Sequence, residues 1–416
     1  MSGGGWSRRR LVGLLARTAT AAAALPAATA CGGPSDPESS SLPGMSTTPT
    51  APGASAGASG RQRESSGPRP LLIGTYTSVE GGGQGIGLAD YDPGTGRVTG
   101  RGVLAEVDDP SYLAVHPDGR TLYTVNERED GAVSAVRLSD RRVLGSRSTG
   151  GAAPCQLSVH PGGRWLLSAN YGSGSVAVHP IDASGALGER TGLVTHSAPP
   201  PGPGQRGPHA HQIVTGPDGN HVLAVDLGTD TVYTYRLDES AGTLKEVARA
   251  RTRAGAGPRH LTFHPGGRHA YLANEVDDTV AVCAYDPDTG RLSIGEAQST
   301  GTGSGTGSGT GSGTNYPAQI LVTSDGSYAF LANRGHNSLT RYAVEAEGAR
   351  LRPLGTVPVG GDYPRQIAFS PDGALLFAAN QRSGTVSVFH VDAGRGELRP
   401  AGEPFASPVA VCALPL

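Results

Sequence analysis

Short apolar runs alternate with polar turns along most of this 416-residue chain. A run such as Leu113-Ala114-Val115 precedes a turn rich in Pro, Asp and Gly, and a second run, such as Leu122-Tyr123-Thr124-Val125, follows it. This pattern is typical of a β-hairpin. An alternating segment such as Thr385-Val386-Ser387-Val388-Phe389 comes next, and a turn of the form Asp-x-x-x-Gly-x-Leu leads to a fourth run. Each unit therefore predicts four strands.

The hairpin turn recurs six times, at intervals of 44 to 59 residues. Its last glycine stands at Gly119, Gly163, Gly219, Gly267, Gly326 and Gly373. Seven residues after these glycines come Asn126, Asn170, Asp226, Asn274, Asn333 and Asn380. A constant offset in six units indicates an internal repeat, and four strands in a repeat of this length are typical of a β-propeller blade.

The two ends of the repeating region complete each other. Leu71–Tyr76 matches the second strand of a repeat, because a third and a fourth strand follow it, and Pro408–Cys412 matches a first strand with nothing after it. Pairing these segments closes the ring and leaves no exposed sheet edge. Residues 70–416 therefore predict an all-β fold: a seven-bladed β-propeller of four-stranded blades, closed by the C-terminal strand in the N-terminal blade.

Three segments differ in composition from the repeats. Residues 1–31 contain Arg8-Arg9-Arg10, an Ala- and Leu-rich run and Ala28-Thr29-Ala30-Cys31, which resemble a twin-arginine export signal with a lipobox that lipidates Cys31; a plain cleaved signal peptide is the alternative. Residues 32–69 have few large apolar side chains and predict a disordered tether of Gly, Pro, Ser and Thr. Residues 300–314 predict a flexible Gly/Ser/Thr insertion. We expect export, either to the outer face of the cell membrane as a lipoprotein or as a secreted protein.

The net charge and the cysteine content bear on which binding partners and which disulfide bonds are expected. The formal net charge is −2, so no nucleic acid is expected, and contact with a membrane is expected only through the lipid anchor. Cys155, Cys283 and Cys412 fall in different repeats. An odd number argues against a complete disulfide framework, so we expect buried free thiols in a monomer.

Polar residues recur where the hairpins open onto the central channel. The first strand of each repeat runs to the turn and the second runs back. The start of the first strand and the end of the second therefore lie at the same mouth of the central channel. Three equivalent positions of the repeats, here called registers, lie at this mouth: eight residues before, seven residues before and eight residues after the turn glycine. They hold Ser111, Cys155, His211, Arg259, Ala318 and Arg365; Tyr112, Gln156, Gln212, His260, Gln319 and Gln366; and Glu127, Tyr171, Leu227, Glu275, Arg334 and Gln381.

The arginines of these registers suggest an anionic substrate. Arg259, Arg334 and Arg365 would bind a carboxylate or a phosphate. The alternative is that each arginine pairs with a rim carboxylate, which Glu127 and Glu275 supply. Glu275 is also a candidate base that activates water against a lactone carbonyl, with an adjacent arginine stabilising the oxyanion.

The third repeat has two extra residues, which give Pro208-His209-Ala210-His211. Strand alternation places His209 and His211 on one side. General acid–base chemistry, substrate contact and a structural hydrogen bond all fit this pair. No third metal ligand accompanies it locally, so no metal is expected at this pair.

Five motifs resemble, in the same order, those of the lactonase propellers, a family similar to 6-phosphogluconolactonases and to a fungal muconate-lactonising enzyme (carboxymuconate cyclase). They are Pro208-His209-Ala210-His211, Gly257-Pro258-Arg259-His260, Ala273-Asn274-Glu275, Ala332-Asn333-Arg334-Gly335-His336 and Pro364-Arg365-Gln366. The resemblance implies hydrolysis of a sugar lactone without metal or organic cofactor. It implies as catalytic residues His211 (or His209), Arg259, Glu275 and Arg334. As substrate contacts we expect His209, Glu127, His260, Arg365 and Gln366.

Other functions stay open for the same mouth. One is a lactonising cycloisomerase acting on a carboxylated substrate, and another is a non-catalytic extracellular propeller that binds a ligand. In a binding module, the charged residues would form ion pairs with each other on a shallow surface. In an enzyme, they would line a deep pocket. 6-Phosphogluconolactone is a cytosolic metabolite, so an export signal points to a different lactone.

The export signal is directly testable. Replacing Arg8 and Arg9 with lysine should block export, because the twin-arginine route reads this pair. Cys31→Ala should release the mature protein from the membrane in a fractionation experiment. Unchanged membrane association of the Cys31→Ala variant would contradict the lipoprotein prediction.

Overall fold

The computed structural model describes residues 67–199, 202, 205–302 and 315–416. The predicted export signal with Cys31, nearly all of the predicted tether and residues 303–314 of the predicted insertion lie outside the described residues. Ser66–Leu416 forms one compact unit.

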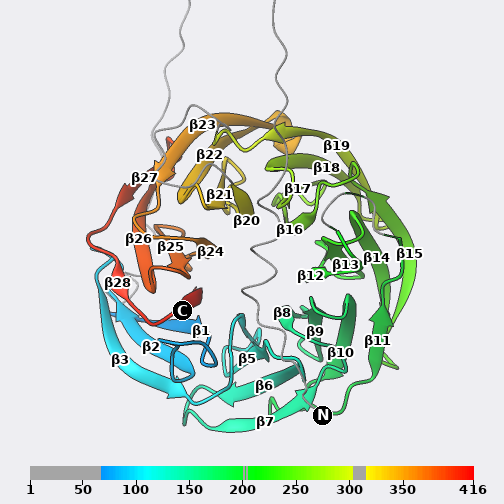
Figure 1. Cartoon of the computed structure of the whole chain (residues 1–416), viewed down its shortest axis with the longest axis horizontal. Coiled ribbons are helices and arrows are strands. Elements are labelled where there is room, and N and C mark those ends of the chain that lie inside the picture. The colour runs from blue at the N-terminus through cyan, green and yellow to red at the C-terminus, as the bar shows by residue number, and fades with distance from the viewer. Residues whose placement is uncertain (1–66, 200–201, 203–204, 303–314) are drawn as a thin grey trace, which may run out of the picture. The chain divides into compact units, whose positions relative to one another are not determined.

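Seven antiparallel sheets of four main strands surround a central axis as the blades of a propeller (Figure 1). From the axis outward, blade 1 contains β29 (Ala410–Pro415), β1 (Arg69–Thr75), β2 (Ile86–Tyr91) and β3 (Val98–Ala105). Blade 2 contains β4 (Leu113–Val115), β5 (Thr121–Asn126), β6 (Ala132–Arg137) and β7 (Val143–Ser148). Blade 3 contains β8 (Pro154–Val159), β9 (Trp165–Asn170), β10 (Ser175–Pro180) and β11 (Gly192–Thr195).

The other four blades repeat this order. Blade 4 contains β12 (Ala210–Thr215), β13 (His221–Asp226), β14 (Thr231–Asp238) and β15 (Thr243–Arg251), and blade 5 contains β16 (Pro258–Phe263), β17 (His269–Asn274), β18 (Thr279–Asp286) and β19 (Arg291–Ser299). Blade 6 contains β20 (Tyr316–Val322), β21 (Tyr328–Arg334), β22 (Ser338–Glu345), the 3-10 helix η1 (Ala346–Gly348) and β23 (Arg350–Pro358). Blade 7 contains β24 (Pro364–Phe369), β25 (Leu375–Asn380), β26 (Thr385–Asp392) and β27 (Glu397–Pro400), with the short β28 (Phe405–Ala406) paired to β26. The predicted all-β, seven-bladed fold is confirmed.

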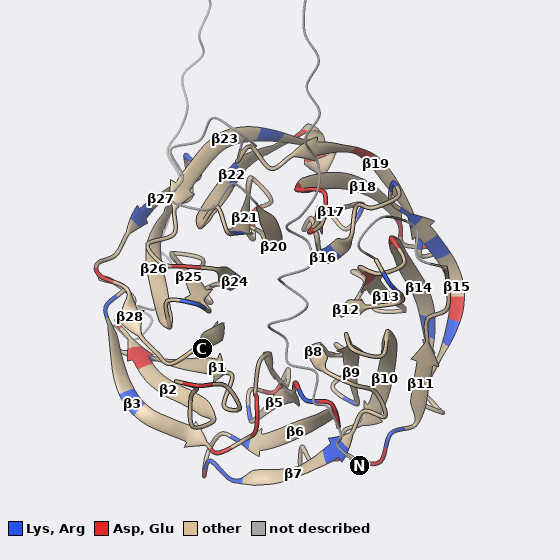
Figure 2. Ribbon diagram, in the orientation of Figure 1, with Lys and Arg blue, Asp and Glu red and all other residues tan. Residues whose placement is uncertain are grey.

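The hydrophobic core lies between the blades rather than at the axis. Seven clusters of buried apolar side chains each join two neighbouring blades, one for every interface of the ring. Between blades 4 and 5, for example, Leu223 and Val225 pack with Leu261 and Leu272. Charged residues are frequent on the outer strands and the loops (Figure 2). Every blade therefore needs a neighbour on both faces to bury its apolar side chains.

The repeated turn glycine has a conformational cause. The six turn glycines have φ between 71° and 77°, a left-handed conformation that glycine adopts without a steric penalty. Each closes its turn by donating its N–H to the carbonyl three residues earlier, as Gly119 does to His116 at 2.8 Å. The Asn that follows caps the next turn: the Asn170 amide donates to Ser175 Oγ at 3.0 Å, and Asn274 donates to Thr279 at 2.9 Å.

The ring closes as the chain ends predict. β29 pairs antiparallel with β1, with Leu72 opposite Leu414 and Ile73 opposite Ala413. The N-terminal blade thus receives its innermost strand from the C-terminus, and β1 is paired on both of its edges. Cys155, Cys283 and Cys412 are all buried, and Cys283 and Cys412 are free thiols, as expected from their distribution over the repeats.

Ring closure predicts the effect of a truncation. Removing residues 410–416 should lower the thermal midpoint and promote aggregation, because it exposes the edge of β1 and the apolar faces of blades 1 and 7. Adding a synthetic peptide of residues 408–416 should restore part of the lost stability in a calorimetric scan. A truncated chain as stable as the full chain would contradict the closure.

Candidate functional site

The innermost strands of blades 3, 4, 5 and 7 carry a β-bulge at the same register, and the pairing is also irregular there in blades 1 and 6. The pairing shifts between Pro154 and Gln156, and equivalent shifts occur in the other three strands. The residues that drop out of the ladder are Cys155, His211, Arg259 and Arg365. A bulge re-aims the side chain of the extra residue, and bulges are frequent beside active sites. The residue eight positions before the turn glycine is thus the bulged residue of the inner strand, and its side chain is re-aimed.

Two arginines from different blades hold one carboxylate oxygen. Arg259 Nε lies 3.0 Å from Glu275 Oε2, and Arg334 Nη2 lies 2.5 Å from the same atom. The arginine side chains are 2% and 5% exposed, whereas that of Glu275 is 20% exposed. Burial by itself would raise the pKa of the Glu275 carboxyl, but Arg334 and Arg259 outweigh it and lower that pKa. Glu275 is therefore an anion whose Oε2 atom lies between two guanidinium groups.

A second ion pair stands at the same mouth. Arg365 Nη2 lies 3.3 Å from Glu127 Oε2, and the Tyr76 hydroxyl donates to that oxygen at 2.6 Å. Burial opposes the charge of Arg365, yet Tyr76 and Glu127 outweigh it and raise its pKa. The alternative of arginines paired with rim carboxylates is thus what the structure has. Three guanidinium groups face two carboxylates, which leaves one positive charge in excess.

The two histidines contact the same aromatic ring. His209 stacks on Tyr171 with ring centroids 4.5 Å apart, and His211 meets Tyr171 edge-on at 5.5 Å. His211 also lies 5.2 Å from His260, centroid to centroid, and 3.8 Å from Cys155 Sγ through Nδ1. Burial, followed by the charge of Arg259, holds the pKa of His211 well below its usual range. His211 is therefore neutral near pH 7, when it can accept a hydrogen bond.

Burial and Arg259 have the same effect on the neighbouring histidine, since they hold the pKa of His260 well below the usual range. Arg334 and Arg365 also contribute to lowering the pKa of both His211 and His260. The structure thus brings together, at one mouth, the four candidate catalytic residues and four of the expected substrate contacts, namely His209, Glu127, His260 and Arg365.

Gln366 has a different environment from these residues. Its Oε1 accepts a hydrogen bond from Ala413 N at 2.7 Å, and its Nε2 donates to Ile367 O at 2.9 Å. Gln156 and Gln212 bridge to the next blade in the same way, through Ile213 N and Leu261 N. This placement favours a clamp between the innermost strands of adjacent blades, and substrate contact by Gln366 stays a prediction.

The register count missed Tyr76 for a definable reason. Tyr76 directly follows β1, as Glu127 follows β5, so it occupies the same register in blade 1. Blade 1 has no hairpin turn before that strand, because its innermost strand comes from the C-terminus. No turn glycine was therefore available from which to count. Tyr363, whose ring centroid lies 5.3 Å from the Arg334 guanidinium, was missed because it stands two residues before the nearest register, at Arg365.

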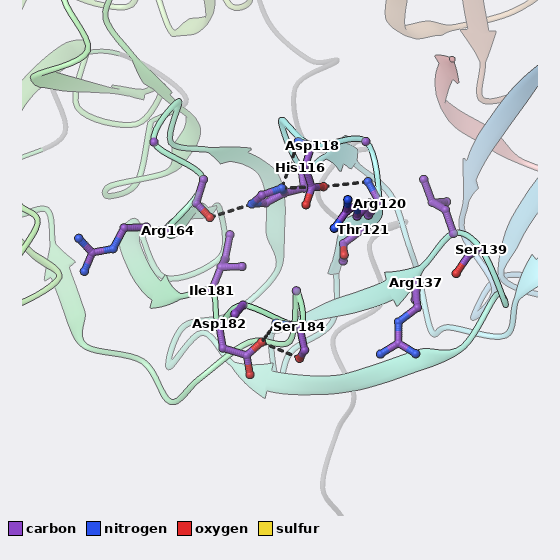
Figure 3. Close-up of a pocket in the computed structure, with 16 residues that line it drawn as sticks. His116, Asp118, Arg120, Thr121, Arg137, Ser139, Arg164, Ile181, Asp182 and Ser184 are labelled. Atoms are coloured by element: carbon purple, nitrogen blue, oxygen red, sulfur yellow. Dashed lines mark hydrogen bonds and ion pairs between the residues drawn. The ribbon is translucent and has the colours of Figure 1, made fainter.

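A cavity of about 1080 Å³ lies on the opposite face, between blades 2 and 3 (Figure 3). Several of its polar side chains take part in hydrogen bonds or ion pairs. His116 contacts Asp118 Oδ1 at 2.8 Å and Gly163 O at 2.8 Å, and the Asp182 carboxylate accepts from Ser184. The described part of the chain holds no group of three or more His, Cys, Asp or Glu side chains arranged to bind a metal ion.

Comparison with known proteins relates the fold and the mouth to one family. Residues 70–415 match the family model described as lactonase, seven-bladed β-propeller. The chain is 31% identical over 277 residues to the 6-phosphogluconolactonase of Bacillus subtilis, which covers 65% of this chain and 76% of that protein. Many similar bacterial proteins, such as one from Lactococcus lactis with 31% identity over 287 residues, are uncharacterised.

Solved structures agree with this assignment. A protein from Lactobacillus plantarum has a TM-score of 0.77 and 32% identity, over 84% of this chain and 99% of that chain. A periplasmic gluconolactonase from Pseudomonas aeruginosa has a TM-score of 0.76 and 31% identity over the same shares of both chains. From its seven four-stranded blades and the match over nearly all of its repeats, the chain belongs to the family of seven-bladed β-propeller lactonases.

Proposed function

We propose that this protein hydrolyses a sugar lactone at the mouth of the central channel that carries Glu275, as an exported, 6-phosphogluconolactonase-like lactonase. The observation that carries the proposal is the pairing of Arg259 and Arg334 with a single oxygen of Glu275. It places a carboxylate, whose side chain is 20% exposed, directly beside two buried cations. Membership of the lactonase family supports the reaction class.

The proposed reaction needs a proton acceptor and a positive field. The Glu275 carboxylate accepts a proton from a water molecule as that water attacks the lactone carbonyl carbon. Arg259 and Arg334 stabilise the negative charge that develops on the carbonyl oxygen, which is the larger catalytic contribution in many acyl transfers. The proton then passes to the ring oxygen as the ring C–O bond breaks, which yields the open hydroxy acid.

Glu275 is a weak base, but a lactone needs only modest activation of the attacking water. The two arginines that orient the carboxylate also lower its pKa, so it is a weaker base than a free glutamate. A lactone is a reactive ester, so modest activation is sufficient, and positioned general-base catalysis supplies roughly 10²–10⁴-fold. His211, which is neutral, is positioned to accept a hydrogen bond from the substrate.

The excess positive charge of the mouth favours an anionic lactone as the substrate. Arg365 supplies the third guanidinium and lies beside Glu127 and Tyr76. A substrate carboxylate or phosphate would compete with Glu127 for Arg365. Export through residues 1–31, with Cys31 as lipid anchor, belongs to the same proposal, and the periplasmic location of the Pseudomonas aeruginosa gluconolactonase supports it.

One observation favours a second candidate function. All three arginines of the mouth take part in ion pairs with Glu127 and Glu275, which is the arrangement expected of a non-catalytic binding propeller. The two functions differ in turnover, so a direct assay separates them.

The first prediction concerns turnover. In a panel of sugar lactones assayed by proton release, the wild-type protein should hydrolyse at least one member. Glu275→Gln should lower kcat by about 10²–10⁴-fold, because it removes the proton acceptor. Arg365→Ala should mainly raise KM, because it removes a contact made equally in the ground state and the transition state.

Circular dichroism of both variants should match the wild type, since neither residue belongs to the apolar clusters between the blades. Full turnover by Glu275→Gln would refute the assignment of the base. If no lactone were hydrolysed by the wild type, the binding function would be favoured.

The second prediction concerns pH. His211 has a pKa well below its usual range, so it stays neutral as the pH falls through about 6.5. Glu275 has a lowered pKa and stays ionised there. The value of kcat/KM should therefore be flat between about pH 5.5 and 7.5 and fall only under more acidic conditions, as Glu275 gains a proton. A loss of activity centred near pH 6.5 that disappears in His211→Gln would instead make His211 the base.

A further inference from the structure

The turn between β13 and β14 carries no candidate site residue, yet it lies beside the mouth. Leu227 occupies the register that holds Glu127, Glu275 and Arg334 in other blades. Two carboxylates flank it, Asp226 at 0% and Asp230 at 2% exposure. Buried carboxylates need several hydrogen bonds to be stable, so their partners indicate what this turn does.

Asp226 binds the segment that carries the histidine pair. Its Oδ1 accepts the backbone N–H of His209 at 2.9 Å, together with those of Gly228 and Thr229 at 3.0 Å each. Its Oδ2 lies 2.6 Å from His196 Nδ1, and His196 Nε2 lies 2.9 Å from the Tyr235 hydroxyl. The carboxylate therefore ties both ends of the 196–209 segment to blade 4.

This contact defines the orientation of the His209 ring. The His209 carbonyl accepts from Leu227 N at 3.0 Å, so the turn holds both backbone groups of the residue. The ring Nδ1 lies 2.8 Å from the Tyr171 carbonyl. A carbonyl only accepts, so Nδ1 carries a proton and donates it to Tyr171. This hydrogen bond and the two backbone contacts together fix the orientation of the His209 ring.

Asp230 binds the loop that carries Arg259. Its Oδ1 accepts from Gly257 N at 2.7 Å, and its Oδ2 accepts from Gly255 N at 2.6 Å. The Gly257 carbonyl in turn accepts from Glu275 N at 2.7 Å. Pro258 and Arg259 follow Gly257 directly, so Asp230 holds the backbone on which the Arg259–Glu275 ion pair is built.

Blade 4 departs here from the other repeats. In the other five, this register holds Asn, whose amide donates hydrogen bonds, as Asn380 does to Thr385 at 3.2 Å and Asn126 does to the Asp108 carbonyl at 2.8 Å. An aspartate accepts only, and Asp226 uses this property to bind the N–H of a residue at the mouth. An acid at position 230 has a counterpart in blade 5, where Asp278 binds the Asn315 amide ahead of blade 6. The acid at position 226 is therefore what distinguishes blade 4.

We infer that Asp226 and Asp230 are positioning residues, which make the β13–β14 turn the common anchor of His209 on one side and of Arg259 and Glu275 on the other. The inference rests on the proposed lactonase function for its kinetic consequence. Its structural content, the anchoring of His209 by Asp226, can be measured without any substrate.

The test compares Asp226 with a matched carboxylate at the opposite face. Asp218, in the β12–β13 turn of the same blade, also binds two backbone N–H groups, a histidine (His221) and a tyrosine hydroxyl (Tyr285). Asp226→Ala should lower kcat by about 10- to 100-fold, the effect expected of a displaced active-site group. Asp218→Ala should lower stability without lowering kcat per folded molecule. Asp226→Asn keeps an acceptor for the His209 N–H, so it should restore most of the turnover.

A second measurement follows His209 directly. Carbethoxylation with diethyl pyrocarbonate, read by peptide mass spectrometry, should modify His209 several-fold faster in Asp226→Ala than in the wild type, and at the wild-type rate in Asp218→Ala. Unchanged labelling in a folded Asp226→Ala protein would overturn the inference, as would equal loss of kcat in the two alanine variants.

If Asp226→Ala does not fold, Asp226→Ser takes its place. Failure of both to fold while Asp218→Ala folds would assign Asp226 to the architecture and overturn its positioning role. A wild-type protein that hydrolyses no lactone would refute the proposed function alone, because the labelling result would still decide the anchoring of His209.

Discussion

A propeller blade cannot bury its apolar faces alone, and this constraint governs the rest of the structure. The seven apolar clusters each need two blades, so the ring is stable only when it is closed. The pairing of β29 with β1 provides the closure. Closure in turn brings the innermost strands of all blades around one axis, which is why residues as distant in sequence as Glu127 and Arg365 form an ion pair.

The inner strands present the polar side chains of the candidate active site at the channel mouth. A bulge at one register removes Cys155, His211, Arg259 and Arg365 from the strand ladders, and the glutamine that follows in three of these four blades bonds to the adjacent blade. The bulged residue therefore differs in chemistry from blade to blade, whereas the glutamine after it links neighbouring blades. This division allows charged groups to gather at the mouth without disturbing the apolar interfaces.

Much of this could be predicted from the sequence, because it depends on local periodicity. The turn glycines need a left-handed φ, so they recur and can be counted, and the unmatched strands at the two ends predict the closure. The bulges, the sharing of Glu275 by two arginines and the role of Tyr76 could not be predicted. They depend on contacts between blades, and in blade 1 on an inner strand supplied by the other end of the chain.

The central claim is that the Arg259–Glu275–Arg334 cluster is where a lactone carbonyl reacts. The most direct measurement is a crystal structure of the Glu275→Gln variant soaked with the best-bound lactone. The account predicts the carbonyl carbon about 3–3.5 Å from the position of an attacking water held by residue 275, with the carbonyl oxygen hydrogen-bonded to Arg259 or Arg334. A lactone bound only at the opposite face, or at the rim without contact to either arginine, would contradict it.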